Sequence, residues 1–242
     1  MKYARKWLSD FFGRKSQSQN LARHEYKQVW NLLSATETDA KIAVAGYSEE
    51  STFRQTAIDT LRQLQICVGI NADDVVLEIG AGVGRVGAVI APLCKEWIGT
   101  DVSENMVTHI RERLSAHSNV RAIATSGFDL TPIPSNSIDL VYCTVVFMHL
   151  DEWDRYNYVL EALRVLKPGG RFYVDNVNLM GNEGWALFES HRALRPEARP
   201  AHMSKTSTPQ ELYVFFSRAG FSSITQIADS MWLITHATKS LA

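Results

Sequence analysis

The sequence predicts an α/β protein built on a doubly wound, mostly parallel sheet. Apolar strand segments alternate with helical patterns five times, and a glycine-rich turn follows the first strand. Two strand segments near the end of the chain are joined by only three residues, which cannot carry a crossover. We therefore expect parallel strands with right-handed crossovers, followed by an antiparallel hairpin.

Composition favours one large domain with a helical addition before it. The chain has 242 residues, enough for one well-filled core, and carries 25 Lys and Arg against 26 Asp and Glu. The formal charge of −1 makes nucleic acid an unexpected partner, so a small-molecule substrate fits better. No apolar run reaches the ~18 residues of a membrane span, and no secretory signal core is evident. These features favour a cytoplasmic protein without stable membrane insertion.

The three cysteines favour buried thiols. Cys67, Cys94 and Cys143 are odd in number, lie far apart and stand in apolar contexts. This spacing matches neither a disulfide framework nor a zinc site. We expect reduced thiols in a reducing compartment.

Residues 1–70 are predicted to form a helical extension, and residues 71–242 the main domain. Four aromatic residues with helical spacing share one face of residues 1–15, among basic residues: Tyr3, Trp7, Phe11 and Phe12. This face would pack on the domain or on a second copy of the chain, which would give a homo-oligomer. A membrane-surface helix is the alternative.

Two further helical patterns cover residues 21–43 and 51–64, and Tyr47 lies in the connection between them. Because both patterns precede the first strand, their helices can lie only across an edge of the sheet or over its carboxyl end. We interpret them as a lid, with Tyr47 as a candidate substrate contact.

The strands and helices of the main domain follow in order. Parallel strands are predicted over residues 75–79, 97–101, 120–124, 138–144 and 171–175. Helices are predicted between them over residues 85–93, 103–114 and 150–166, with Ser103 and Asp151 as N-caps. The tail adds a helix over residues 182–194, a capping box at Thr208, and a hairpin of strands 221–227 and 231–237.

A glycine-rich turn and a carboxylate mark the expected ligand site. Gly80, Gly82 and Gly84 follow the first strand, where they let the backbone turn sharply and let a ligand approach. Asp101 ends the second strand, 21 residues after Gly80, which is the separation expected of a carboxylate that accepts hydrogen bonds from ribose. Ligands of such sheets bind beyond the carboxyl ends of the strands, so both features point to one site.

The turn departs from the dinucleotide fingerprint. The third glycine comes one residue early, at Gly84, and Arg85 stands where that fingerprint has a glycine. Glu78 places a carboxylate just before the first glycine, which suits a cationic ligand better than a pyrophosphate. A dehydrogenase with a degenerate fingerprint is therefore kept only as an alternative.

These motifs resemble those of class I S-adenosylmethionine-dependent methyltransferases, in particular the small-molecule, type 11-like group that includes the quinone-biosynthesis C-methyltransferases. The resemblance rests on EIGAGVG at residues 78–84, Asp101 and LKPGG at residues 166–170, and it spans residues 73–176. It implies a Rossmann-like fold of seven strands in the order 3-2-1-4-5-7-6, with the last strand antiparallel. It also implies methyl transfer from S-adenosyl-L-methionine to an O, N or C atom of a small molecule.

The resemblance further implies which residues bind the cofactor. Glu78 and the turn that contains Gly80, Ala81, Gly82 and Gly84 would hold the methionine part, and Asp101 would hold the ribose. Val102 and Met106 would line the adenine pocket, and Thr144 would face the sulfonium. Gly127, Phe128 and Asp129 match the stretch that meets adenine, where Asp129 would accept the exocyclic amine; a plain turn residue is the alternative for Asp129.

His149 is the candidate catalytic residue. It is the one residue just after the fourth strand that can remove a proton near neutral pH, and the resemblance places this region beside the sulfonium and the acceptor. The alternative is a hydrogen bond from His149 to a loop carbonyl or to the substrate.

Candidate acceptor contacts lie farther along the chain: Asn176, Asn178, Trp185, His191 and Arg192. Asp175 and Asn176 resemble two magnesium ligands of catechol-type O-methyltransferases, but Thr144 stands where the third ligand should be, so we expect no metal. Metal-dependent O-methylation and a non-catalytic cofactor-binding module stay as alternatives. Core packing of Trp185, and a solvated helix face for His191 and Arg192, are the competing interpretations.

Overall fold

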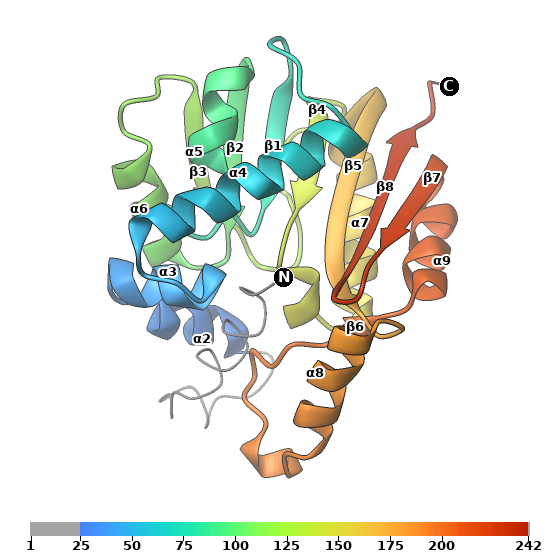
Figure 1. Cartoon of the computed structure of the whole chain (residues 1–242). Helices are drawn as coiled ribbons and strands as arrows, with labels where there is room; N and C mark the ends of the chain where they lie inside the picture. The colour runs from blue at the N-terminus through green and yellow to red at the C-terminus, as the bar shows by residue number, and fades with distance from the viewer. Residues whose placement is uncertain (1–24, 242) are drawn as a thin grey trace.

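The computed structural model describes residues 25–241, in which a mixed sheet lies between two layers of helices (Figure 1). The main strands are β1 (Val75–Ile79), β2 (Glu96–Asp101), β3 (Val120–Ala124), β4 (Ile138–Cys143), β5 (Leu166–Asn178), β7 (Phe221–Ala228) and β8 (Trp232–Lys239). Their order is β3-β2-β1-β4-β5-β8-β7, with β8 antiparallel to both neighbours. The expected order is confirmed, because the remaining strand, β6 (Thr206–Ser207), is only a two-residue addition beside the end of β5.

β1 is a central strand, with β2 and β4 parallel to it on either side. Val76 and Leu77 are fully buried because helices cover both faces of the sheet, as the apolar run predicted. β5 begins earlier than expected: Leu166 pairs with Ile138, and the ladder shifts register before it resumes at Arg171. The LKPGG motif at residues 166–170 is thus an irregularity inside one long strand.

One face of the sheet is covered by α4 (Glu50–Cys67), α5 (Gly87–Ile90) and α6 (Glu104–Arg113). α4 crosses this face in Figure 1, and its Leu64 packs in one cluster with Val76 and Trp97. This corrects the expectation that α4 forms part of a lid, because its apolar stripe is buried against the sheet. The helix predicted over residues 85–93 is shorter than expected and ends in a 3-10 turn, η3 (Ala91–Leu93).

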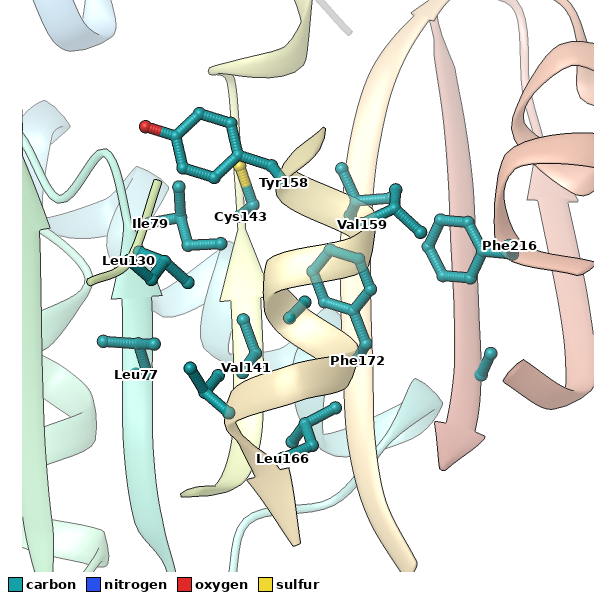
Figure 2. Packing of buried hydrophobic residues seen from close by; sticks show 14 of the residues in the cluster. Leu77, Ile79, Leu130, Val141, Cys143, Tyr158, Val159, Leu166, Phe172 and Phe216 are labelled. Carbon is teal, nitrogen blue, oxygen red and sulfur yellow. The ribbon is translucent and has the colours of Figure 1, made fainter. Parts of the chain in front are cut away.

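The opposite face is covered by α7 (Glu152–Val165) and α9 (Pro209–Ala219). Figure 2 shows how β5 meets this layer: Phe172 stacks on Phe216 of α9, with ring centroids 5.1 Å apart. Thr208 caps α9 as predicted, by accepting the backbone N–H of Glu211 at 3.3 Å. Asp151 stands at the N-cap position of α7, but its carboxylate pairs with Lys205 and makes no side-chain cap.

At the end of the sheet that is lower in Figure 1 lie α2 (Tyr26–Leu33), α3 (Glu37–Ala45) and α8 (Asn182–Arg192). The single helix predicted over residues 21–43 is two helices in its described part. Ser34 ends α2 by donating its hydroxyl to the Trp30 carbonyl at 2.6 Å, and Thr36 caps α3 by accepting the N–H of Asp39. We call α2 and α3 the lid.

Three sequence-based expectations concern the first residues of the chain, membrane spans and the cysteines. The aromatic helix expected over residues 1–15 lies outside the described residues. Between residues 25 and 241, no helix combines the length and apolarity needed to cross a membrane. Cys67, Cys94 and Cys143 are free thiols, and Cys67 is the most exposed of the three.

Candidate functional site

A pocket of about 750 Å³, counted with its open mouth, lies at the carboxyl ends of β1, β2 and β4. Four groups of residues line it: Tyr26, Trp30, Ala43 and Val44 of the lid; Ile79, Gly80 and Gly82 at the end of β1 and in the turn after it; Thr100, Asp101, Val102, Met106, Thr125 and Gly127 near β2 and β3; and Thr144, Val145, Val146, His149, Leu150 and Tyr158 near β4 and α7.

The glycine-rich turn can make close contacts on two sides because it lacks side chains. Gly80 and Gly82 have φ values of +69° and +56°. A Cβ on Gly80 would lie 2.3 Å from Val146, and a Cβ on Gly82 would lie 2.6 Å from Val44 of the lid. Gly84 is also in the left-handed region but lies behind the turn, against Leu114. The turn therefore touches both the lid and the loop after β4.

Asp101 ties the end of β2 to the glycine-rich turn. One carboxylate oxygen accepts the N–H of Gly82, and the other accepts the N–H of Ser103, each at 2.9 Å. Burial raises the pKa of Asp101 to about 6, and backbone donors of Ser103, Gly82 and Val102 oppose this rise. A carboxylate offers about four acceptor sites, so Asp101 can also receive a hydroxyl group from a ligand in the pocket.

Glu78 lies beneath the turn and does not line the pocket. Its side chain is buried and accepts the phenol hydroxyl of Tyr142, which in turn accepts the indole N–H of Trp97 at 2.9 Å. Desolvation raises the pKa of Glu78 to about 8 despite the nearby Arg85 guanidinium. The negative charge expected from the sequence is thus largely absent near neutral pH when no ligand is bound.

Arg85, which breaks the dinucleotide fingerprint, packs under α4. Its guanidinium donates to the hydroxyls of Thr56 and Thr60 at 3.2 and 3.4 Å. Burial raises the pKa of Asp175 to about 7, while a hydrogen bond from Val145 and the charge of Arg85 oppose the rise. Arg85 therefore serves as the counter-charge of a buried polar cluster on the α4 side of the sheet.

His149 lies in the pocket wall, on a 3-10 turn, η4 (Phe147–His149), that follows β4. Its Nδ1 lies 2.7 Å from the carbonyl oxygen of His202, so in the neutral ring Nδ1 carries the proton and Nε2 does not. The Trp30 ring of the lid meets the imidazole edge-on, with centroids 4.9 Å apart. The loop-carbonyl hydrogen bond considered from the sequence is present, and it makes Nε2 the basic nitrogen of the neutral ring.

Two further contacts hold the η4 turn. Arg155, a buried residue of α7, donates Nε–H to the Phe147 carbonyl at 2.8 Å and contacts Ser207 and Glu211 through its other end. The Lys205 backbone N–H donates to the Met148 carbonyl at 2.6 Å. The segment that contains residues 202–207 therefore braces the turn that carries His149.

The remaining cofactor candidates are divided by the structure. Val102, Met106, Gly127 and Thr144 line the pocket together with Asp101. Phe128 is more than half exposed and Asp129 accepts the N–H of Thr131 at 3.1 Å, and neither lines the pocket. Ala81 also lies behind the turn, where its N–H donates to the Thr100 carbonyl.

The candidate acceptor residues do not line this pocket. Asn176 donates to Ser207 at 2.7 Å, and Asn178 bridges Asp229 and Met180, so both stabilise neighbouring loops. Tyr47 packs against the cluster of Met148, Val177, Leu187 and Met231. Trp185 packs against Phe188 with tilted rings, His191 lies 3.0 Å from the Ser204 carbonyl, and Arg192 pairs with Glu189 on the surface of α8.

Asp175 and Asn176 point to opposite faces of β5. Asp175 joins the polar cluster of Arg85, whereas Asn176 contacts Ser207 on the other side. Successive strand residues face opposite ways, so the two side chains cannot share one ligand sphere. In the described part of the chain, no group of three or more His, Cys, Asp or Glu side chains could hold a metal ion.

Sequence reasoning missed the lid residues of the pocket. Tyr26 donates its hydroxyl to the Gly127 carbonyl at 2.5 Å, and Trp30 contacts His149. Both residues stand on one face of an amphipathic helix, four positions apart, which is the signal that could have marked them. Val145, Val146, Leu150 and Tyr158 were also missed, because their place in the wall follows from packing around β4.

Fold and site together define a Rossmann-like α/β protein whose pocket lies at the strand ends beside a glycine-rich turn. Residues 77–174 match the methyltransferase domain family. This stretch therefore matches the class I S-adenosylmethionine-dependent methyltransferase domain that its motifs predicted.

Relatives and solved structures agree with this domain. A probable S-adenosylmethionine-dependent methyltransferase of Mycolicibacterium smegmatis is 33% identical over 152 residues, which cover 61% of this chain and 54% of that protein. A demethylmenaquinone methyltransferase of Tropheryma whipplei is 29% identical over 150 residues, covering 62% of this chain and 58% of that protein. The chain thus spans little more than half the length of these relatives.

A solved structure is similar over most of the chain. The crystal structure of the [4+2]-cyclase SpnF covers 91% of this chain and 97% of the SpnF chain, with a TM-score of 0.67 and 14% identity. This shows a likeness of fold.

Proposed function

We propose that this chain binds S-adenosyl-L-methionine in the pocket and transfers its methyl group to a small molecule. The observation that carries the proposal is Asp101, whose carboxylate lines the pocket, is oriented by Gly82 and Ser103, and keeps acceptor capacity toward a ligand. Ribose hydroxyls are donors of the kind that such a carboxylate accepts. The match of residues 77–174 to the methyltransferase domain family supports the same function.

The neighbours of Asp101 fit the other parts of this cofactor. Val102 and Met106 supply apolar surface for a purine ring, and Gly80 and Gly82 bring bare backbone to the pocket wall. Glu78 would support the turn from below, through Tyr142, and would not contact the cofactor directly. When bound, the cofactor supplies a methyl group that is already activated on a sulfonium.

His149 is the proposed proton acceptor of the reaction. The hydrogen bond between Nδ1 and the His202 carbonyl leaves Nε2 as the nitrogen able to take a proton from a hydroxyl or amine group. Trp30 limits rotation of the ring from the lid side. A base is required only for acceptors that keep their proton. The proposal therefore covers O, N and C acceptors, with His149 needed only for those that must lose a proton.

The lid is proposed to exclude water from the pocket during the reaction. Tyr26 and Trp30 reach the pocket from α2, and Val44 of α3 packs on Gly82. An enclosed pocket can hold acceptor and methyl group close and in line, which can lower the barrier by up to ~7–11 kcal/mol in well-oriented systems. Removal of the lid contacts should therefore slow the reaction more than it weakens cofactor binding.

Calorimetric titration tests the cofactor assignment. We expect S-adenosylmethionine and its product S-adenosylhomocysteine to bind, and NAD not to bind. Binding of NAD without either sulfur compound would contradict the proposal and favour a dehydrogenase. Methyl transfer is then measured with radiolabelled cofactor, beginning with demethylmenaquinone because one relative is named for that acceptor.

A non-catalytic or differently catalytic pocket is the second candidate. It is favoured by the likeness of almost the whole fold to a protein named as a [4+2]-cyclase. The two candidates differ in one measurement: methyl transfer to any acceptor supports the first, whereas cofactor binding without label transfer to a broad acceptor panel supports the second.

A further inference from the structure

Val145 adopts a backbone conformation that its side chain disfavours. It lies just after β4, lines the pocket and has a φ of +60°. Three non-glycine residues of the described chain have positive φ, namely Asn136, Val145 and Ser223, and of these Val145 alone is β-branched and lines the pocket. A β-branched residue in the left-handed region is strained and persists only where surrounding contacts hold it.

Asp175 makes the contact that holds Val145. Its Oδ1 accepts the backbone N–H of Val145 at 2.7 Å, from the strand that pairs with β4. The Asp175 carboxylate faces the charge of Arg85, which is itself anchored by Thr56 and Thr60 of α4. The acceptor of this hydrogen bond is thus fixed by the packing of α4 on the sheet.

Two parts of the pocket depend on the bend at Val145. The next residue, Val146, fills the space where a Cβ on Gly80 would lie, only 2.3 Å away. The Val146 carbonyl also accepts the N–H of His149 at 2.8 Å and so begins the η4 turn. The bend therefore aligns both the wall beside the glycine-rich turn and the turn that carries His149.

We propose that Asp175 is a positioning residue, which holds Val145 in the left-handed conformation and thereby aligns the Gly80 wall and the His149 turn. The proposal rests on the function proposed for the pocket. It gives a role to Asp175 that requires no metal, and it gives a role to Arg85, which the comparison with dinucleotide fingerprints left unexplained. Neither side chain lines the pocket, so both act through the backbone of the loop after β4.

Three variants separate this hydrogen bond from general stability. Asp175→Ala should weaken S-adenosylhomocysteine binding by at least about tenfold, because Val145 loses its restraint and the loop relaxes. Asp175→Asn should stay within about threefold of the wild type, because the amide oxygen can accept the same N–H. Asp175→Ala combined with Val145→Gly should regain most of the affinity, because glycine adopts positive φ without strain.

The position of His149 supplies a readout that needs no ligand. In the free protein, Asp175→Ala should move the imidazole proton resonances of His149, and the added Val145→Gly should return them toward the wild-type positions. This measurement separates the two proposals, because it stays valid even if S-adenosylhomocysteine does not bind. Absence of binding with the expected shifts would overturn the proposed function and leave the positioning role in place.

Asp139→Ala is the matched control. Asp139 likewise accepts a backbone N–H, that of Val75 at 2.8 Å, and likewise faces a cation, Lys167, but at the amino end of β1. It should lower the midpoint of thermal unfolding without moving His149 or weakening S-adenosylhomocysteine binding. The positioning role is overturned if Asp175→Ala leaves the His149 resonances unmoved, if Asp139→Ala moves them equally, or if Val145→Gly restores nothing.

Discussion

Asp101 and Gly82 are joined by a hydrogen bond of 2.9 Å, in which the backbone N–H of the glycine donates to the carboxylate. This contact connects the end of β2 to the turn after β1, so the proposed ribose acceptor and the glycine-rich turn form one unit. Asp101→Ala should weaken S-adenosylhomocysteine binding by ~1.5–3 kcal/mol, the range for hydrogen bonds to a charged group. Calorimetric titration measures this loss.

Asp129→Ala is the control for that experiment. Asp129 is partly exposed and lies outside the pocket, in the same loop region as Gly127. Its affinity for S-adenosylhomocysteine should match that of the wild type. If Asp129→Ala lost more affinity than Asp101→Ala, the nucleoside would lie at Asp129, and the assignment to Asp101 would be wrong.

Cofactor affinity should depend on pH through Asp101. Burial raises the pKa of this carboxyl to about 6 in the ligand-free chain, so the carboxylate is present at pH 7–8 and is lost as the pH falls through about 6. Protonation removes acceptor capacity, and S-adenosylhomocysteine affinity should fall on the acid side of pH 6. Titrations from pH 5 to pH 8 check this, and Asp101→Asn should flatten the profile.

His149→Asn should slow methyl transfer far more than it weakens cofactor binding. Asparagine can still donate to the His202 carbonyl but offers no basic nitrogen, so kcat should fall by about 10²–10⁴-fold for a hydroxyl or amine acceptor. S-adenosylhomocysteine affinity should stay within about threefold. His117→Asn, remote from the pocket, should leave both values unchanged; equal turnover in His149→Asn and the wild type would exclude the base.

Stability should fall as the pH rises from 7 to 8.5, chiefly through Glu78. Its pKa is raised to about 8 in the folded chain, so the folded state keeps a proton that the unfolded state has already lost. The unfolded state then binds fewer protons, which makes the slope of unfolding free energy against pH negative. Thermal unfolding of the ligand-free protein measures this slope, and Glu78→Gln should reduce it; an unchanged slope would contradict the assignment.

Gly82→Ala should destabilise the chain and displace the lid. The residue has a φ of +56°, and an added Cβ would lie 2.6 Å from Val44, so the substitution combines backbone strain with a clash. The cost should be about 1–3 kcal/mol of unfolding free energy. The displaced lid should also weaken cofactor binding, and Val44→Ala in the same chain should restore part of that affinity because it removes the clash. The backbone strain at residue 82 would remain, so the denaturation midpoint should stay below that of the wild type.

Local sequence patterns predicted most of the fold and several residues that line the pocket. The apolar runs at β1 and β4 and the three-residue link before β8 have short-range physical causes: burial on both faces, and a connection too short for a crossover. Thr36 and Ser34 show where this reasoning failed. A helical pattern over residues 21–43 did not reveal that their side chains end one helix and start the next.

The residues expected to contact a methyl acceptor do not line the pocket. Asn176, Trp185 and Arg192 were chosen by their position after β5, yet each is occupied by a neighbour outside the pocket. Trp30 takes a place in the pocket instead, because the lid folds back over the strand ends. Spacing along the chain carries no information about which helix returns to cover a site.

By itself, the sequence determined the order of strands and helices, the glycine-rich turn and the carboxylate of Asp101, because each depends on local periodicity, backbone freedom or distance along the chain. Only the tertiary structure decided that His149 meets His202 and Trp30, and that Asp175 restrains Val145. Those contacts join residues from separate strands, helices and loops. They arise when the sheet, α4 and the lid pack together. Burial in that packing raises the pKa values of Glu78 and Asp175, so both carboxyl groups carry less negative charge near neutral pH than exposed ones would.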